Sequence, residues 1–101
     1  MSPDMNNRSA QILRALQKKY ALEILIDLLD HPYSTVVDLS DRLTTTNYKT
    51  VLGRIKELTA CGLITTSVAE RYNAHQLRNT TLGKSVAMAI VGALEGDDTK
   101  N

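Results

Sequence analysis

Two lysines and a glycine give the sequence its clearest indication of chemistry. Lys49, Gly53 and Lys56 follow one another at steps of four and three residues, so a helix would place them on one face. An ammonium group donates hydrogen bonds to phosphates and to guanine. Glycine permits close approach of a partner, although at a mid-helix position it costs about 1 kcal/mol relative to alanine. The pattern favours a helix face that meets a polyanion, with an ordinary solvated face as the alternative.

The segment around these lysines has the signs of a complete helix over residues 47–61. Asn47 or Thr46 can cap its N-terminus, because a short side-chain oxygen accepts from unpaired first-turn N–H groups. Gly62 follows it, at the position where a left-handed conformation is usual. The face opposite the lysines is apolar and is expected to pack on a core. It consists of Val51, Ile55 and Leu58.

The other reactive side chains do not form a recognised site. Cys61 is the only cysteine, so an internal disulfide is excluded, and the end of a helix lacks the cationic setting that lowers a thiol pKa. Asp27 and His31 lie one helical turn apart, but two ligands are too few for a structural zinc site. No phosphate-binding glycine loop or nucleophile elbow is present. The sequence predicts no enzyme, cofactor or metal site, with redox control through Cys61 as an open alternative.

The net charge of +1 hides a basic middle region. Residues 42–84 hold seven lysines and arginines against two glutamates, a net charge of +5, whereas residues 1–41 and 85–101 each carry −2. A local positive surface on a near-neutral chain is typical of proteins that bind a polyanion. Chance clustering on a solvated surface is the alternative.

A chain of this length, 101 residues, is predicted to form one domain over residues 1–101. It contains no apolar run long enough to span a bilayer and no secretory signal, and a lone cysteine fits a reducing compartment. We therefore expect a cytoplasmic protein. Residues 1–7 and 96–101 are polar and are expected to be disordered tails.

Apolar periodicity predicts two helices before the helix that carries the lysines. The first extends over residues 9–29 and either runs unbroken for about 30 Å or bends near residues 18–19. Pro32 follows it, and the residue before a proline avoids the α region. The second covers residues 36–43 and is capped by one of the two hydroxyl residues before it. Residues 44–46 then form a polar turn, which gives the helix-turn-helix plan.

A change of period after the third helix predicts an antiparallel hairpin, or wing, over residues 63–79. β-Branched residues over 63–68 favour a strand, and residues 74–79 can return beside it. The polar turn between them offers Arg71 and Tyr72 at its tip. The chain is therefore mainly α with a small β-hairpin.

A last helix is predicted from a threonine cap, Thr80 or Thr81, to about Leu94. Apolar residues cover so much of its circumference that it must be buried on more than one side. The domain core supplies one side, and we expect a second copy of the chain to supply the other. One apolar face consists of Leu82, Val86, Ile90, Ala93 and Leu94, and Met88 and Val91 widen it.

Three segments also carry a likeness to known proteins. They are KKYALEILIDLLDHP, KTVLGRIKELTACGLI and HQLRNTTLGKSVA, all within residues 12–94. In these segments and their order the chain resembles winged helix-turn-helix transcriptional regulators of the MarR, ArsR and HxlR types, with the HxlR group nearest. The resemblance implies double-stranded DNA as a partner and a homodimer formed through the N- and C-terminal helices. The chain departs from the pattern in its short wing and in Asn79, which stands where an apolar strand residue is usual.

A recognition helix of this kind would present its N-terminus and outer face to the major groove. There lysine donates to guanine and asparagine pairs with adenine, while cations of the wing contact phosphates or the minor groove. Arg42 and Arg54 each either flank this face or pair locally, for example Arg42 with Asp38. The predicted DNA-contacting residues are Asn47, Tyr48, Lys49, Thr50, Gly53, Arg54, Lys56, Arg71 and Arg78.

These features together favour a homodimeric, sequence-specific DNA-binding regulator. Repression by blocking polymerase access is the simplest mechanism, because the chain has no room for an activating domain. A winged-helix module that binds another protein instead of DNA is the alternative. A small-molecule effector is compatible with the first function, but no residue set identifies one.

Overall fold

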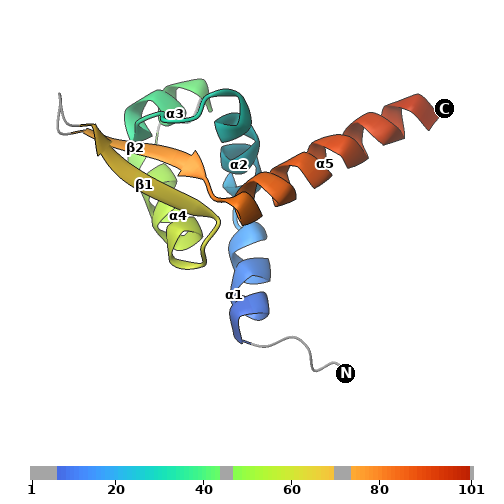
Figure 1. Ribbon diagram of the computed structural model, residues 1–101, viewed down its shortest axis with the longest axis horizontal. Helices are drawn as coiled ribbons and strands as arrows, with labels where there is room; N and C mark the ends of the chain where they lie inside the picture. Colours follow the sequence, from blue (N-terminus) through green and yellow to red (C-terminus); the bar gives the residue numbers. More distant parts are fainter. Residues whose placement is uncertain (1–6, 44–46, 70–73, 101) are drawn as a thin grey trace.

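The computed structural model describes residues 7–43, 47–69 and 74–100 of the chain (Figure 1). Within them lie the helices α1 (Asn7–Leu16), α2 (Ala21–Asp30), α3 (Val36–Arg42) and α4 (Tyr48–Ala60), the strands β1 (Ile64–Ala69) and β2 (Ala74–Asn79), and the helix α5 (Thr81–Lys100). The two strands form one antiparallel sheet. The predicted mainly α fold with one small hairpin is confirmed, in the predicted order.

Two helices, α1 and α2, replace the single helix predicted over residues 9–29, so the alternative with a break is the correct one. Tyr20 sits in the break with φ 73°, a left-handed conformation that costs a residue with a side chain about 1–2 kcal/mol. No glycine or proline lies there. The reason is tertiary packing, because α1 contacts α4 whereas α2 packs mainly on α5 and β2. One straight helix would not follow both directions.

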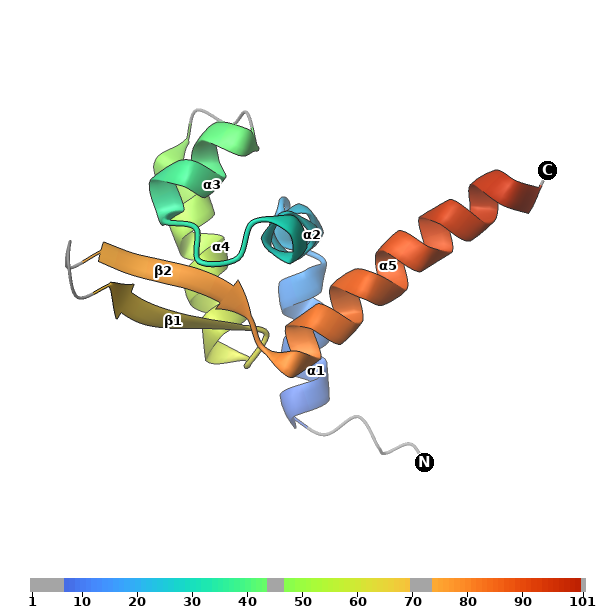
Figure 2. The ribbon, with the colours of Figure 1, turned by 45° about the horizontal axis from the view of Figure 1, so that its top comes forward.

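A short link after α2 ties the helices to the hairpin. It contains Pro32, and the two residues after it run beside β2 (Figure 2). The Tyr33 N–H donates to the Leu77 carbonyl at 2.7 Å, and the Leu77 N–H donates to the Ser34 carbonyl at 2.8 Å. These two bonds form a single β-bridge and fix the hairpin against the entry to α3.

A reciprocal cap starts α3. The Thr35 hydroxyl accepts from the Asp38 N–H at 3.1 Å, and the Asp38 carboxylate accepts from the Thr35 N–H at 3.3 Å, so both orphan donors are satisfied. Of the two predicted caps, Ser34 and Thr35, the structure therefore selects Thr35. Leu39 on the inner face is completely buried. The predicted turn over residues 44–46, with the alternative cap Thr46, lies outside the described residues.

Both ends of α4 follow the prediction. The Asn47 Oδ1 accepts from the Thr50 N–H at 3.1 Å, and Gly62 takes the left-handed conformation with φ 87°. Burial of the inner face settles which side of α4 points outward. The buried residues are the predicted Val51, Ile55 and Leu58.

The wing is confirmed as a hairpin whose strands pair along their whole length. β1 begins one residue later than predicted, because the Leu63 N–H still closes the end of α4 by donating to the Leu58 carbonyl at 2.9 Å. The predicted turn over residues 70–73, with Arg71 and Tyr72, lies outside the described residues. Alternation puts Thr66, Val68, His75 and Leu77 on the face toward α4, and Thr65, Ser67, Gln76 and Arg78 on the other face.

α5 begins in close contact with the domain and then leaves it (Figure 1). The Thr80 hydroxyl accepts from the Gly83 N–H at 3.1 Å and donates to the Gly62 carbonyl at 2.6 Å, which joins the start of α5 to the end of α4. Gly83 is needed because a Cβ at that position would overlap the Leu63 carbonyl oxygen. The first turns of α5 are therefore held tightly against the base of the wing.

The length and the buried face of α5 both differ from the prediction. The helix ends at Lys100 and not near Leu94, so it includes residues 96–100 of the predicted tail. Over residues 81–96, where burial is described, its buried residues are the small Gly83 and Ala87, not the large residues of the predicted stripe. Leu94 in that stripe is 61% exposed. The C-terminal part of the stripe thus lies outside the core of its own chain.

The core lies where α2, α3, α4 and the hairpin meet. Asn79, which stands where the regulators that the sequence resembles usually have an apolar residue, is buried at the base of β2. Its Nδ2 donates to the Leu25 carbonyl at 3.0 Å, so the amide links the wing to α2 in place of an apolar contact. The largest completely buried side chains are Ile24, Leu25, Leu28, Leu39, Val51, Leu58, Leu63, Ile64 and Leu77.

Candidate nucleic-acid interface

The outer face of α4 carries the predicted lysines. Lys49 and Lys56 are exposed, and neither forms an ion pair with any residue that the structure describes. Gly53 lies between them, and a Cβ added there would meet no atom within 4 Å. The chain itself therefore gives no steric reason for glycine at this position, whereas close approach of an external partner would.

The N-terminus of α4 places three more predicted residues. The Asn47 side chain is exposed, and its Oδ1 is engaged by the helix cap. Tyr48 is 46% exposed, so its ring is available to a partner. Thr50 is half-buried and points to the flank of α4 nearer α1, about a quarter turn or more from Lys49 and Lys56. Asn47 and Tyr48 are thus exposed at this end of α4, whereas Thr50 is not.

Arg54 lies on the flank of α4 nearest α1, not on the outer face. Its guanidinium donates to the Glu57 carboxylate at 2.6 Å, and the Arg54 side chain is only 21% exposed. Lys18, in the break between α1 and α2, approaches the same carboxylate at 3.5 Å. The hydrogen bond from Arg54 lowers the pKa of Glu57, with Lys18 adding a smaller effect. The structure therefore gives Arg54 a partner within the fold.

The structure shows which partner Arg42 binds. Its Nε and Nη2 both donate to the carboxylate of Asp27 in α2, with N–O distances from 2.7 to 3.0 Å. The same Nη2 also donates to the Ser34 hydroxyl at 2.6 Å. The local partner suggested for it, Asp38, is wrong, because the Asp38 carboxylate caps α3 instead. The bond to Asp27 raises the pKa of Arg42. Arg42 thus fastens α3 to α2.

Arg78, the wing cation that the structure describes, does not join the lysines of α4. Arg71 lies outside the described residues. Arg78 is exposed on the face of the hairpin that points away from α4, with its guanidinium 6.0 Å from the centre of the Tyr33 ring. A contact between Arg78 and DNA would therefore lie to the side of the surface formed by Lys49 and Lys56.

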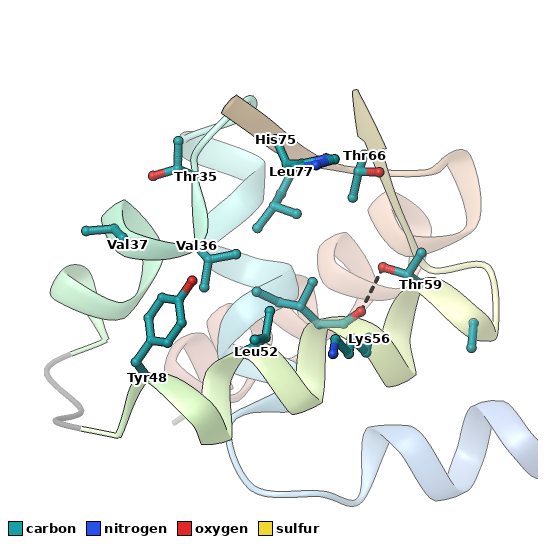
Figure 3. Close-up of a pocket in the computed structure, with 12 residues that line it drawn as sticks. Thr35, Val36, Val37, Tyr48, Leu52, Lys56, Thr59, Thr66, His75 and Leu77 are labelled. Atoms are coloured by element: carbon teal, nitrogen blue, oxygen red, sulfur yellow. Dashed lines mark hydrogen bonds between the residues drawn. The ribbon is translucent and has the colours of Figure 1, made fainter. Parts of the chain in front are cut away.

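An apolar groove between α3, α4 and the wing was not predicted from the sequence. It has a volume of about 660 Å³ and borders the outer face of α4 (Figure 3). Two signals in the sequence point to it. Adjacent apolar residues at the start of α3 cannot both face the core, and Leu52 lies outside the apolar stripe of α4. The apolar lining is supplied chiefly by Val36, Val37, Tyr48, Leu52, Ile55 and Leu77.

Cys61 is a buried thiol at the end of α4. Its Sγ–H donates to the Leu58 carbonyl at 3.6 Å, and burial raises the pKa of the thiol above its ordinary value. A raised pKa keeps the thiol protonated and unreactive near neutral pH. Among the described residues no three His, Cys, Asp or Glu side chains gather as a metal site requires. No helix in the described part of the chain has both the length and the apolar character to cross a membrane.

The arrangement of α3 and α4, followed by a hairpin packed beside α4, is the winged-helix fold. No family model matches the sequence, and no curated protein matches it. Solved structures match the chain, and at sequence identities near 20% these matches establish the fold. The winged-helix resemblance drawn from the sequence is thus confirmed.

Three of these similar structures match over nearly the whole chain. The reduced form of the transcriptional regulator YodB from B. subtilis has a TM-score of 0.76 at 18% identity, covering 95% of this chain and 94% of that one. A possible HxlR family transcriptional factor from Thermoplasma volcanium gives 0.76 at 19%, covering 97% and 84%. The S. aureus MepR–DNA complex gives 0.75 at 18%, covering 97% and 82%. By contrast, the chain spans 54% of the length of Lactococcus lactis ZitR.

Proposed function

We propose that this protein is a sequence-specific transcriptional regulator that binds double-stranded DNA through α4. The observation that carries the proposal is the outer face of α4, where Lys49 and Lys56 are exposed without an ion pair in the described structure and flank Gly53. A protein of the same fold, MepR, has been solved in complex with DNA, which supports this choice of partner. The proposed activity is binding without catalysis, in the reducing environment of the cytoplasm.

In this proposal α4 enters the major groove. Lys49 and Lys56 donate to guanine acceptors or to the phosphates at the groove edges, and Asn47 lies at the entering end of the helix. The wing, residues 63–79, lies on the backbone or the minor groove and brings Arg71 and Arg78 as phosphate contacts. The burial of Val51, Ile55 and Leu58 supports a rigid presentation of this face.

We also propose that the DNA-bound form is a homodimer. The part of α5 that leaves the domain carries apolar residues without cover from their own chain, among them Met88, 59% exposed, and Leu94 (Figure 1). Pairing with a second copy, with α1 contributing, would bury them. Two α4 helices would then meet successive major grooves about 34 Å apart on a pseudo-palindromic site. Occupation of such a site acts as repression by excluding polymerase.

Selection of bound sequences from a random duplex pool tests DNA binding. We expect a recurring motif with two related half-sites, one turn of DNA apart, and tight binding of that duplex by fluorescence anisotropy at low salt. No binding at micromolar protein in 50 mM salt would contradict the proposal and favour a module that binds another protein. A motif without repetition would leave DNA binding intact and contradict the homodimer.

Replacement of Met88 by aspartate tests the dimer separately. Buried side chains of this size contribute about 1.5–3 kcal/mol, and a two-fold interface contains the residue twice, so Met88→Asp should weaken self-association by at least about a hundredfold. Sedimentation velocity measures this. Val68→Asp is the matched control, because Val68 is a similarly exposed apolar residue on the wing. Equal self-association of both variants and the wild type would contradict the assignment of α5.

A further inference from the structure

The groove beside α4 places apolar side chains next to the cations of the proposed DNA surface. Tyr48, Leu52 and Lys56 follow one another at four-residue steps, so they form one row along α4. This row forms one wall of the groove and borders the row that carries Lys49 and Gly53. Figure 3 shows the Tyr48 ring beside Val36, with Leu77 of the wing across the groove. A partner that reaches both lysines also meets the apolar row.

The side chains at the mouth of the groove are not required by the fold. Val37 is 56% exposed and Tyr48 is 46% exposed, although buried neighbours complete the core beneath them. An apolar side chain held half in water at a proposed binding surface gains from a partner that covers it. The partner must accept cations on one side of the row and apolar groups on the other.

Duplex DNA offers one apolar group in its major groove, which is the 5-methyl group of thymine. Phosphates and the other base edges are polar and would be desolvated against valine and tyrosine without compensation. We infer that the mouth of the groove, formed by Val37, Tyr48 and Leu52, reads thymine methyl groups beside the bases or phosphates that Lys49 and Lys56 contact. The inference rests on the proposed function and adds a preference for thymine at defined positions of each half-site.

Replacement of thymine by uracil tests this inference with the loss of one methyl group and no change in hydrogen bonding. Each thymine of the selected duplex is replaced in turn, and the dissociation constant is measured by anisotropy at fixed salt. Loss of one buried methyl group corresponds to a weakening of about fourfold. We expect that loss at one or two thymines in each half-site, and no change at the others. Symmetric replacement in both half-sites should give about fifteenfold.

Two variants locate the contact on the protein. Val37→Ser and Tyr48→Ser should each reduce the ratio between the uracil and thymine dissociation constants toward one at a sensitive position. Val68→Ser is the matched control, because it makes the same change at a similarly exposed valine that does not line the groove. Val68 belongs to the wing, so a lost backbone contact would weaken the binding of the thymine and uracil duplexes alike, and the ratio should keep its wild-type value. Val37 and Tyr48 are both about half exposed and lie outside the buried core, so folding should survive, and circular dichroism checks it.

The outcomes separate this inference from the proposed function. If the pool yields no bound duplex, both the inference and the proposed function are contradicted. A bound duplex that has no recurring thymine, or that binds equally well with uracil throughout, overturns the inference and leaves DNA binding standing, with the groove then free for a small apolar ligand or a second chain. Full uracil sensitivity in both serine variants would also overturn it, because the methyl groups would then be read elsewhere.

Discussion

The cations around α3 and α4 fall into two groups that the sequence does not distinguish. Arg42 and Arg54 are 29% and 21% exposed and are bound to carboxylates of their own chain. Lys49 and Lys56 are exposed and form no ion pair within the described residues. Arginine has a planar, forked group that suits bidentate bonds to a carboxylate, whereas lysine carries a compact and strongly hydrated charge. Arg42 therefore fastens α3 to α2 and Arg54 is paired within α4, whereas the lysines remain available for an anionic partner.

The two flanks of α4 therefore differ. The flank toward α1 is closed by Arg54, Glu57 and Lys18, and the opposite flank is open and apolar. Only the outer face combines free charge with free space. Net charge alone would count Arg42 and Arg54 as part of the proposed binding surface, whereas both are paired with carboxylates of their own chain.

The largest effect on stability is expected at Arg42. Arg42→Ala leaves the Asp27 carboxylate, 14% exposed, without its partner and removes a donor from Ser34, so the free energy of unfolding should fall by about 2 kcal/mol. Urea denaturation measures it. Lys49→Ala is the control and should change stability by less than about 0.5 kcal/mol. Equal losses in the two variants would abolish the distinction between the two groups of cations.

Pairing of Arg42 with Asp27 can be isolated by a double-mutant cycle. The variant that lacks both side chains should lose less stability than the sum of the single losses, because neither partner is then left unpaired. Additive losses would mean that the two groups stabilise the fold independently.

A smaller effect, of opposite sign, is expected at Gly53. Gly53→Ala removes the backbone entropy cost of glycine within a helix, and a Cβ at this position meets open space. The free energy of unfolding should therefore rise by about 1 kcal/mol. The added methyl group should also obstruct a close partner and weaken DNA binding by at least about fivefold. Thermal unfolding and anisotropy on one preparation measure both. A stabilised variant with unchanged affinity would place Gly53 outside the interface.

The smallest effect on stability is expected at acidic pH, where Glu57 becomes protonated. The hydrogen bond from Arg54 lowers the pKa of Glu57 from its ordinary 4.5 in the folded state, so its stabilising contribution is present above pH 4.5 and is lost as pH falls through the folded pKa. Glu57→Gln should therefore be less stable than the wild type near pH 7, with the gap closing below pH 4.5. Denaturation at several pH values detects it, and a constant gap would show that the carboxylate charge is not responsible.

Much of the fold could be predicted because its signals are local. The cap at Asn47, the left-handed Gly62 and the apolar period of α4 each act within a few residues, and all three are present in the structure. The break at Tyr20 has no such signal, because it follows from how α1 and α2 pack on different elements. The burial of α5 through Gly83 likewise depends on the distant Leu63 carbonyl.

The candidate site could be predicted only in part, for the same reason. The helical period places Lys49, Gly53 and Lys56 together, and the structure agrees. The partner of Arg42 lies 15 residues away along the chain, so local spacing pointed to the wrong carboxylate. The apolar groove forms only when the wing packs beside α4. The surplus apolar residues of α3 and α4 indicate an uncovered apolar surface, but no local pattern specifies that the wing lies beside it. Long-range contacts therefore account for both the missed pairing and the missed groove.

The salt dependence of DNA binding tests the central claim most directly. Lys49→Ala with Lys56→Ala should weaken binding and make the slope of log affinity against log salt less negative by about 1.8, if each lysine neutralises one phosphate at about 0.9 per contact. Arg54→Ala, the paired cation on the same helix, should keep the wild-type slope. If the lysine double variant retains the affinity and slope of the wild type, the outer face of α4 is not the DNA-binding surface.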